Sequence, residues 1–138
     1  MDRPVVSPHE IRNPETLPPA QGFSHAVIAR AGRTVYLAGQ TAQQKDGTVV
    51  GATLAEQFDV AAGNVVKALE AAGAHPQDLV SMQIFVTDVA EYQRTSKQIG
   101  EAYRRHFGRH YPAMALLEVR RLFDPAAKVE LVCVAVTS

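Results

Sequence analysis

Glu130 is the residue of this sequence with the clearest potential for chemistry. It lies in the run KVELVCVAV, and in an extended strand its side chain shares a face with three valines, at positions 132, 134 and 136. A carboxylate among apolar neighbours must be paired or hydrogen-bonded if it is buried, and a positioned carboxylate can serve as a general acid or base. A glutamate near a strand end with its carboxylate in water gives the same pattern. The residues alone leave both interpretations open.

A basic cluster offers a second set of candidate groups. His106 and His110 have the i, i+4 spacing of two metal ligands, but Gly108 lies between them and predicts the end of a helix. No third ligand is evident, so we expect no metal. The cluster also contains Arg104, Arg105 and Arg109. Cations are favoured at a helix C-terminus, which is the interpretation we adopt, and contact with phosphate or RNA is the alternative.

Ser24 and His25 begin an expected strand, where loop residues can line a pocket. Because adjacent side chains diverge along an extended chain, we do not expect them to act as a nucleophile and its base. The sequence contains no glycine-rich phosphate loop, no nucleophile elbow and no CxxC motif. We therefore expect no cofactor.

Hydrophobic periodicity and turn residues predict the elements that position these groups. Thr53 with Glu56, and Asp88 with Glu91, have the spacing of helix N-caps, and glycines follow each helical stripe at positions 73 and 108. Strands are expected at 24–30 and 34–39, joined as a hairpin, and at 48–50, 79–86, 113–120 and 128–136. This order predicts an α+β fold in which two helices pack on one face of a five- to six-stranded sheet.

Composition narrows the class of protein. The chain has 138 residues, a mass of 15.0 kDa, and 14 basic and 14 acidic residues, so we expect one domain that binds neither nucleic acid nor a membrane. Five of the eight prolines fall within the first nineteen residues, which predicts an extended arm at 1–21 and a single domain at 22–138. One cysteine, Cys133, and an N-terminus without a signal-like apolar core favour a cytoplasmic location.

The segment 113–117 is apolar on both faces of its expected strand. A half-exposed strand alternates polar and apolar residues, so both faces of this one need a cover. The two helices can cover one face only. The simplest cover for the other is a second copy of the chain, which predicts a homo-oligomer.

Several segments together resemble the RidA/YjgF family, in the expected order from about residue 22 to the C-terminus. They are GFSHAV at 22–27, VYLAGQ at 35–40, NV at 64–65, EAAG at 70–73, FVTD at 85–88, YPA at 111–113, KVE at 128–130 and VAV at 134–136. The resemblance implies a chorismate-mutase-like fold with a mixed sheet, and a homotrimer with ligand sites in clefts between subunits. Well-known members hydrolyse reactive enamines and imines and release ammonia and a 2-keto acid.

The resemblance also implies roles for particular residues. Glu130 matches a glutamate that positions or activates water, Gly39 a glycine of the cleft, and Phe23 an aromatic residue of the cleft loop. We expect Ser24 and His25 to lie beside Phe23 in the substrate pocket.

This sequence departs from the family pattern where related enzymes bind substrate. Met114 stands at the position of a carboxylate-binding arginine and Leu116 where many members have cysteine, so we expect an apolar pocket floor. Arg120 is expected on the same strand face as Met114, but six residues at ~3.3 Å each place it about 20 Å away. The second helix is about one turn longer than usual, which leaves a cleft asparagine without a counterpart.

Two functions of different classes follow from these features. The first is a hydrolytic deaminase for a small enamine, imine or amino-dienoate compound, which the retained Glu130 favours. The alternative is a non-catalytic trimer that binds a small metabolite or a protein partner, which Met114 favours. RNA cleavage, a third activity attached to the family, is disfavoured by the zero net charge.

Overall fold

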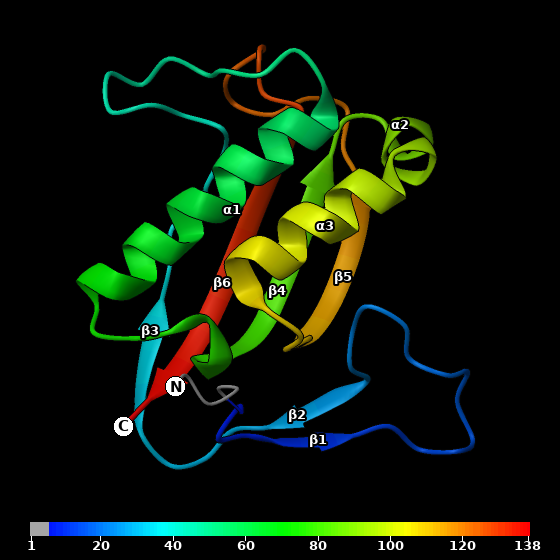
Figure 1. Cartoon of the computed structure of the whole chain (residues 1–138), viewed down its shortest axis with the longest axis vertical. Coiled ribbons are helices and arrows are strands. Elements are labelled where there is room, and N and C mark those ends of the chain that lie inside the picture. Colours follow the sequence, from blue (N-terminus) through cyan, green and yellow to red (C-terminus); the bar gives the residue numbers. More distant parts are fainter. Residues whose placement is uncertain (1–5) are drawn as a thin grey trace.

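A four-stranded sheet with helices on one side forms the body of the molecule (Figure 1). The structure is a computed structural model that describes residues 6–138. The strands are β3 (Arg33–Tyr36), β4 (Leu79–Val86), β5 (Ala113–Glu118) and β6 (Val129–Thr137). Their order in the sheet is β3-β6-β4-β5, with β4 and β5 parallel and the other two pairings antiparallel. The mixed α+β arrangement predicted from the sequence is confirmed.

The helices begin where the capping residues predict. Thr53 accepts a hydrogen bond from the Glu56 amide at the start of α1 (Leu54–Ala71), and Asp88 accepts one from the Glu91 amide at the start of α2 (Val89–Arg94). The second predicted helix is broken at Thr95, so that α2 is followed by a separate α3 (Ser96–Phe107). A short 3-10 helix, η1, occupies Pro76–Asp78. None of the helices within residues 6–138 is both long enough and apolar enough to cross a bilayer.

The predicted hairpin of residues 24–39 is wrong. Its first strand, β2 (Ala26–Ile28), pairs instead with β1 (Glu10–Arg12) of the expected N-terminal arm, and its second, β3, pairs with β6. Gly32 lies so close to the Thr137 carbonyl that a Cβ atom would overlap it, so only glycine lets the chain pass this near to β6. The six strands within residues 6–138 therefore form a four-stranded and a two-stranded sheet. The short strand expected at 48–50 is a single bridge between Gln43 and Val49.

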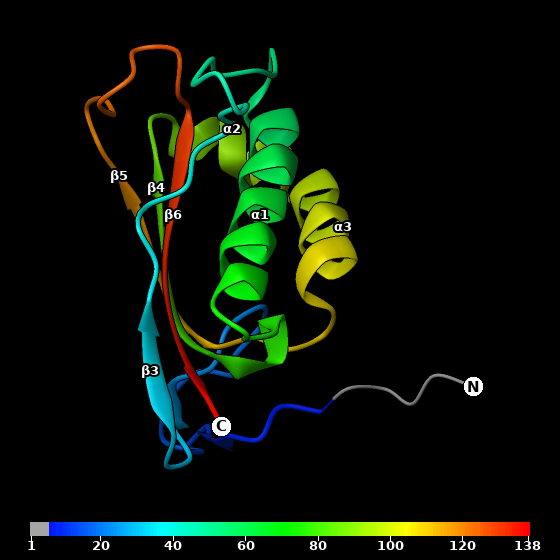
Figure 2. The ribbon, with the colours of Figure 1, turned by 90° about the vertical axis from the view of Figure 1, so that its left-hand side faces the viewer.

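The two faces of the main sheet differ in what covers them. On one face Phe58 of α1 and Phe107 of α3 pack fully buried against Leu131 and Cys133 of β6. Figure 2 shows that the helices lie on this side of the sheet only. On the open face the side chains of Tyr36 and Leu117 are 81% and 42% exposed, so the apolar residues there lack a cover within the described chain.

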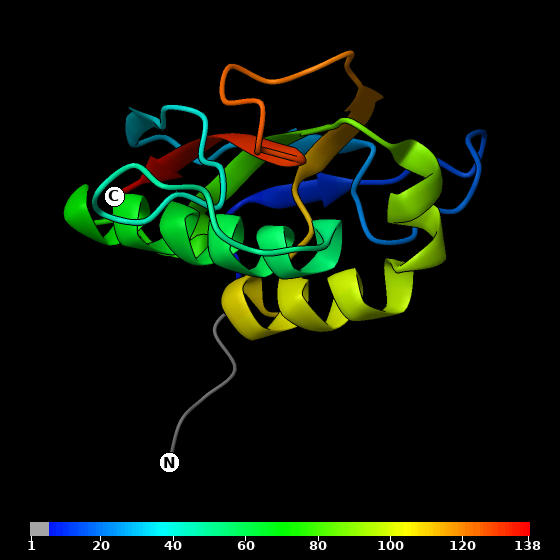
Figure 3. The same cartoon turned by 90° about the horizontal axis from the view of Figure 1, so that it is seen from above.

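The small sheet of β1 and β2 lies below the end of the main sheet (Figures 1 and 3). Buried His9 attaches it there, because its ring donates to the Asp78 carbonyl at 2.8 Å and accepts from the Arg30 amide at 3.1 Å. His110 makes an equivalent bond to the Leu79 carbonyl at 2.7 Å. Burial lowers the pKa of His110, so the ring is held neutral.

Candidate active site

Glu130 lies at the start of β6, directly over the backbone of Gly39. Gln40 and Leu131 exchange two backbone hydrogen bonds, which bring the Gly39 segment beside β6. A Cβ atom on Gly39 would stand 2.6 Å from Glu130 Oε2, so only glycine leaves room for the carboxylate in this position. Within residues 6–138 the half-buried carboxylate has no hydrogen bond or ion pair, which leaves it free for water or a ligand.

Met114 and Glu130 point to opposite faces of the sheet. Met114 is in register with buried Met82, which faces the helices, whereas Glu130 is in register with Phe85, which faces the open side. Neighbouring residues in a ladder project to the same face. One subunit therefore does not bring these two predicted site residues together.

A cavity of about 320 Å³ lies beside the free edge of β5 and is lined by Phe23, Met114 and Leu116. Three of the predicted substrate-binding residues are thus neighbours. The other lining residues are Gln21, Gly22, Ile84, Tyr92 and Ala115. Gln21 and the Tyr92 hydroxyl are the polar groups of this lining. The other side chains are apolar, and Gly22 has none.

Ser24 and His25 hold the loop that carries Phe23. The Ser24 hydroxyl donates to the Tyr111 carbonyl at 2.5 Å, and the Ser24 amide donates to the Pro112 carbonyl at 3.0 Å. His25 donates to the Pro18 carbonyl at 2.7 Å, and its ring meets the Phe23 ring edge-on. Both polar side chains therefore position the loop rather than contact the cavity with Met114.

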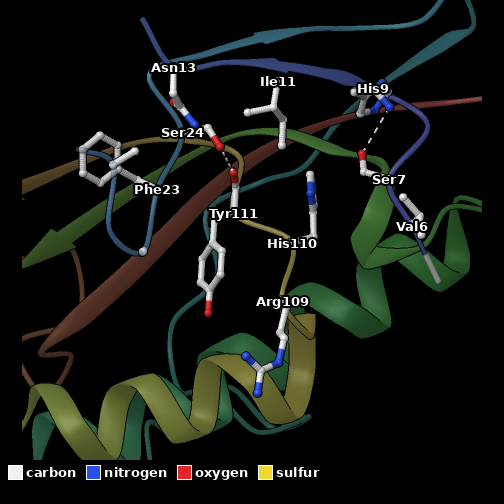
Figure 4. A pocket seen from close by; sticks show the side chains of 12 residues that line it. Val6, Ser7, His9, Ile11, Asn13, Phe23, Ser24, Arg109, His110 and Tyr111 are labelled. Carbon is white, nitrogen blue, oxygen red and sulfur yellow. Dashed lines mark hydrogen bonds between the residues drawn. The ribbon is translucent and has the colours of Figure 1, made fainter. Parts of the chain in front are cut away.

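On the other side of this loop a separate cavity of about 570 Å³ opens between β1 and the segment 109–111 (Figure 4). Ser24 and Phe23 line it, together with His9, Asn13 and His110. The two ring nitrogens of His9 and the Nε2 of His110 are already bonded to the backbone. Hydrogen bonds to the backbone fix the histidine side chains that line this cavity, and neither Glu130 nor Met114 is among its lining residues.

A deeper cavity of about 380 Å³ continues from the Met114 cavity toward α3. The two share Gln21, Gly22, Ile84, Tyr92 and Met114. The deeper one is also lined by Ser96, Ile99, Gly100, Tyr103, Arg104 and Tyr111. The sequence does not indicate that Ser96, Gly100 and Arg104 line one cavity, because a basic helix end has the residue pattern of a solvated surface. Gly100, a glycine inside a helix, was the available signal.

The basic cluster is divided between separate partners. His106 Nε2 lies 2.7 Å from Asp59 on α1, and His110 bonds to Leu79, so the two rings do not face one site. Asp59 also pairs with Arg105 at 3.2 Å. Burial would raise the pKa of the Asp59 carboxyl, but the hydrogen bonds from the His106 and Arg105 side chains outweigh burial and lower it. Within residues 6–138 no group of three His, Cys, Asp or Glu side chains has the arrangement of a metal site.

Arg120 and Cys133 do not line the cavities described above. Arg120 does not lie on a strand, because β5 ends at Glu118, so the prediction that it shares a strand face with Met114 is wrong. Cys133 is buried against the helices, and this burial raises the pKa of its thiol to about 12. A protonated, buried thiol is not a nucleophile at neutral pH.

Comparison with known proteins assigns the family. The profile described as endoribonuclease L-PSP matches residues 14–137. The human 2-iminobutanoate/2-iminopropanoate deaminase is 27% identical over 115 residues, which cover 83% of this chain and 79% of the human protein. YyfB, a Rid family protein of unknown function from Yersinia pestis, superposes with a TM-score of 0.84 at 30% identity, over 94% of this chain and 98% of that one.

A third relative supports the same assignment. A member of the YjgF/YER057c/UK114 family from Mycobacterium tuberculosis is 33% identical, with a TM-score of 0.62 over 84% of this chain and 87% of that one. The family profile covers most of this chain, and the solved relatives share its α+β arrangement. The fold is therefore that of the RidA/YjgF proteins, and this chain belongs to that family.

Proposed function

We propose that this protein is a hydrolytic deaminase for a small imine or enamine, and that Glu130 handles the water. The position of the Glu130 carboxylate over Gly39 carries the proposal, because both residues are of the types that the family resemblance implies for the reaction. The names of the human and bovine relatives, which are 27% and 28% identical, support this reaction class.

Hydrolysis of an imine needs a base and an acid at one place. Glu130 would accept a proton from water as the water oxygen bonds to the imine carbon, and would pass it to the nitrogen. The hydroxyl of the resulting carbinolamine then gives its proton to Glu130, which passes it to the amino nitrogen. As the carbonyl forms, the C–N bond breaks, and ammonia and a 2-keto acid leave. An enamine first takes a proton on carbon and gives one up from nitrogen to become the imine. No redox partner is required.

The site would form between subunits of a homotrimer. Glu130 faces the open side of the sheet, whereas the cavity of Phe23 and Met114 lies at the β5 edge on the helix side. A neighbouring copy packed on the open face would bring its own β5 edge toward Glu130 and would cover the apolar residues there. Glu130 of one subunit and the cavity of the next would then share one cleft.

The deaminase activity is tested with a substrate that a second enzyme generates in the assay mixture. We expect the purified full-length protein to accelerate release of ammonia and 2-oxobutanoate from enzymatically generated 2-iminobutanoate, measured with a coupled ammonia assay. The control reaction contains the generating enzyme alone. Equal rates with and without the protein would contradict the proposal for this class of substrate.

One observation favours the second candidate function, a trimer that binds a metabolite without converting it. Met114 contributes a thioether to the cavity where a charged anchor would hold a carboxylate, and its neighbours Leu116 and Ile84 are apolar. A protein of this kind would bind the 2-keto acid or a similar compound and would show no acceleration in the ammonia assay.

A further inference from the structure

Among residues 6–138, side chains with hydrogen-bond donors, and no carboxylates, line the deeper cavity between α3 and β5. Six of them carry donor groups: Gln21, Tyr92, Ser96, Tyr103, Arg104 and Tyr111. The Tyr103 hydroxyl is already used, because it donates to the His110 carbonyl at 2.6 Å. The hydroxyls of Tyr92 and Tyr111 make no hydrogen bond within residues 6–138. A cavity with this lining is complementary to a ligand that brings acceptors and negative charge.

Among the described residues, Arg104 is the one cation that lines this cavity. Its guanidinium folds back along α3, and Nη1 lies 3.3 Å from the place that a Cβ atom on Gly100 would occupy. Arg104 has no ion pair within the described chain, whereas the next residue, Arg105, points toward α1 and pairs with Asp59 at 3.2 Å. Two adjacent arginines therefore have different roles, one bound to α1 and one unpaired at the cavity mouth.

The walls of the cavity are aromatic and apolar. The rings of Tyr103 and Tyr111 are stacked with centroids 5.0 Å apart and an angle of 11° between them. Ile84 and Met114 continue the wall toward the cavity of Phe23. A volume of about 380 Å³ suits a small molecule with a planar or branched apolar body.

We propose that this cavity binds a small carboxylate with an apolar or aromatic body, and that Arg104 is the anchor for its carboxylate group. The guanidinium fork suits a carboxylate, and the phenol hydroxyls add donors beside it. If the bound carboxylate is the substrate, this role of Arg104 rests on the proposed function. Binding of a carboxylate by Arg104 does not itself require that the protein be a catalyst.

The charge preference is measured with two probes of the same shape. We expect calorimetric titration of the full-length protein to show about tenfold tighter binding of phenylacetate than of neutral phenylacetamide. Arg104→Gln removes this difference, Arg104→Lys keeps part of it, and the matched control Arg105→Gln keeps all of it. The proposal is overturned if wild type shows no preference for phenylacetate, including the case in which neither probe binds, or if Arg104→Gln retains the preference.

The two proposals fail in different ways. The Glu130→Gln protein is expected to keep the Arg104-dependent preference for phenylacetate over phenylacetamide, because Glu130 is not among the residues that hold or surround Arg104 within one subunit. If the ammonia assay shows no activity while the Arg104-dependent preference persists, the deaminase is refuted and the anchor stands. If the enzyme is active and Arg104→Gln keeps the preference, the anchor alone is refuted.

Discussion

Replacing Glu130 with glutamine is expected to lower the rate of ammonia release from 2-iminobutanoate by about 100-fold or more, the usual contribution of a general acid or base. Glutamine has nearly the same shape, so it can occupy the space over Gly39 without a clash. It cannot accept a proton from water at neutral pH. The effect should therefore appear in kcat and not in the affinity for the substrate.

Denaturation of the Glu130→Gln protein distinguishes a loss of catalysis from a loss of folding. Glu130 is half-buried and makes no hydrogen bond or ion pair within residues 6–138, so Glu130→Gln should change the denaturation midpoint little. Glu70→Gln on α1 is the matched control for loss of one carboxylate, because the exposed Glu70 side chain also makes no hydrogen bond or ion pair within residues 6–138, and it should keep wild-type activity. A Glu130→Gln protein with a wild-type rate would remove Glu130 from the mechanism.

Replacing Phe58 with alanine is expected to lower the free energy of unfolding by about 3–5 kcal/mol. The Phe58 side chain is fully buried on α1, in the layer between the helices and the sheet. Deleting the ring leaves a cavity that the surrounding layer fills only in part. Urea denaturation followed by circular dichroism measures the change.

The chain contains its own control for this substitution. Phe123 is 103% exposed, in the loop between β5 and β6, so Phe123→Ala removes the same ring without opening a cavity. Its effect on the free energy of unfolding should stay within about 0.5 kcal/mol. If both substitutions cost the same, the core is not the layer between the helices and the sheet.

Local signals in the sequence predicted the starts of α1 and α2 and most of the strands, but not the break at Thr95 that begins α3. The N-caps at Thr53 and Asp88 and the strand at 79–86 are found where the residues indicated. The pairing of strands was less predictable, since β2 pairs with β1 and β3 with β6 through contacts distant in sequence. Turn residues at 31–33 indicate that the chain reverses direction. They do not indicate which strand the following segment pairs with.

The candidate site was predicted in part. The apolar neighbours in sequence identified Glu130, and the resemblance identified Gly39, which the structure places together. Arg120 has the spacing from Met114 that would place both on one strand face, but it lies beyond the end of β5. Arg104 enters the same cavity from α3, and only the packing of α3 beside β5 reveals this proximity.

A mixing experiment tests the cleft between subunits most directly. Glu130→Gln lacks the base, and Met114→Glu places a negative charge in the cavity that repels the substrate carboxylate, so each protein alone should be inactive. When the two are unfolded and refolded together in equal amounts, about one quarter of the clefts should combine an intact Glu130 with an intact neighbouring cavity. We predict that the mixture regains about a quarter of the wild-type rate of ammonia release. A mixture no more active than the separate variants would contradict a site shared between subunits.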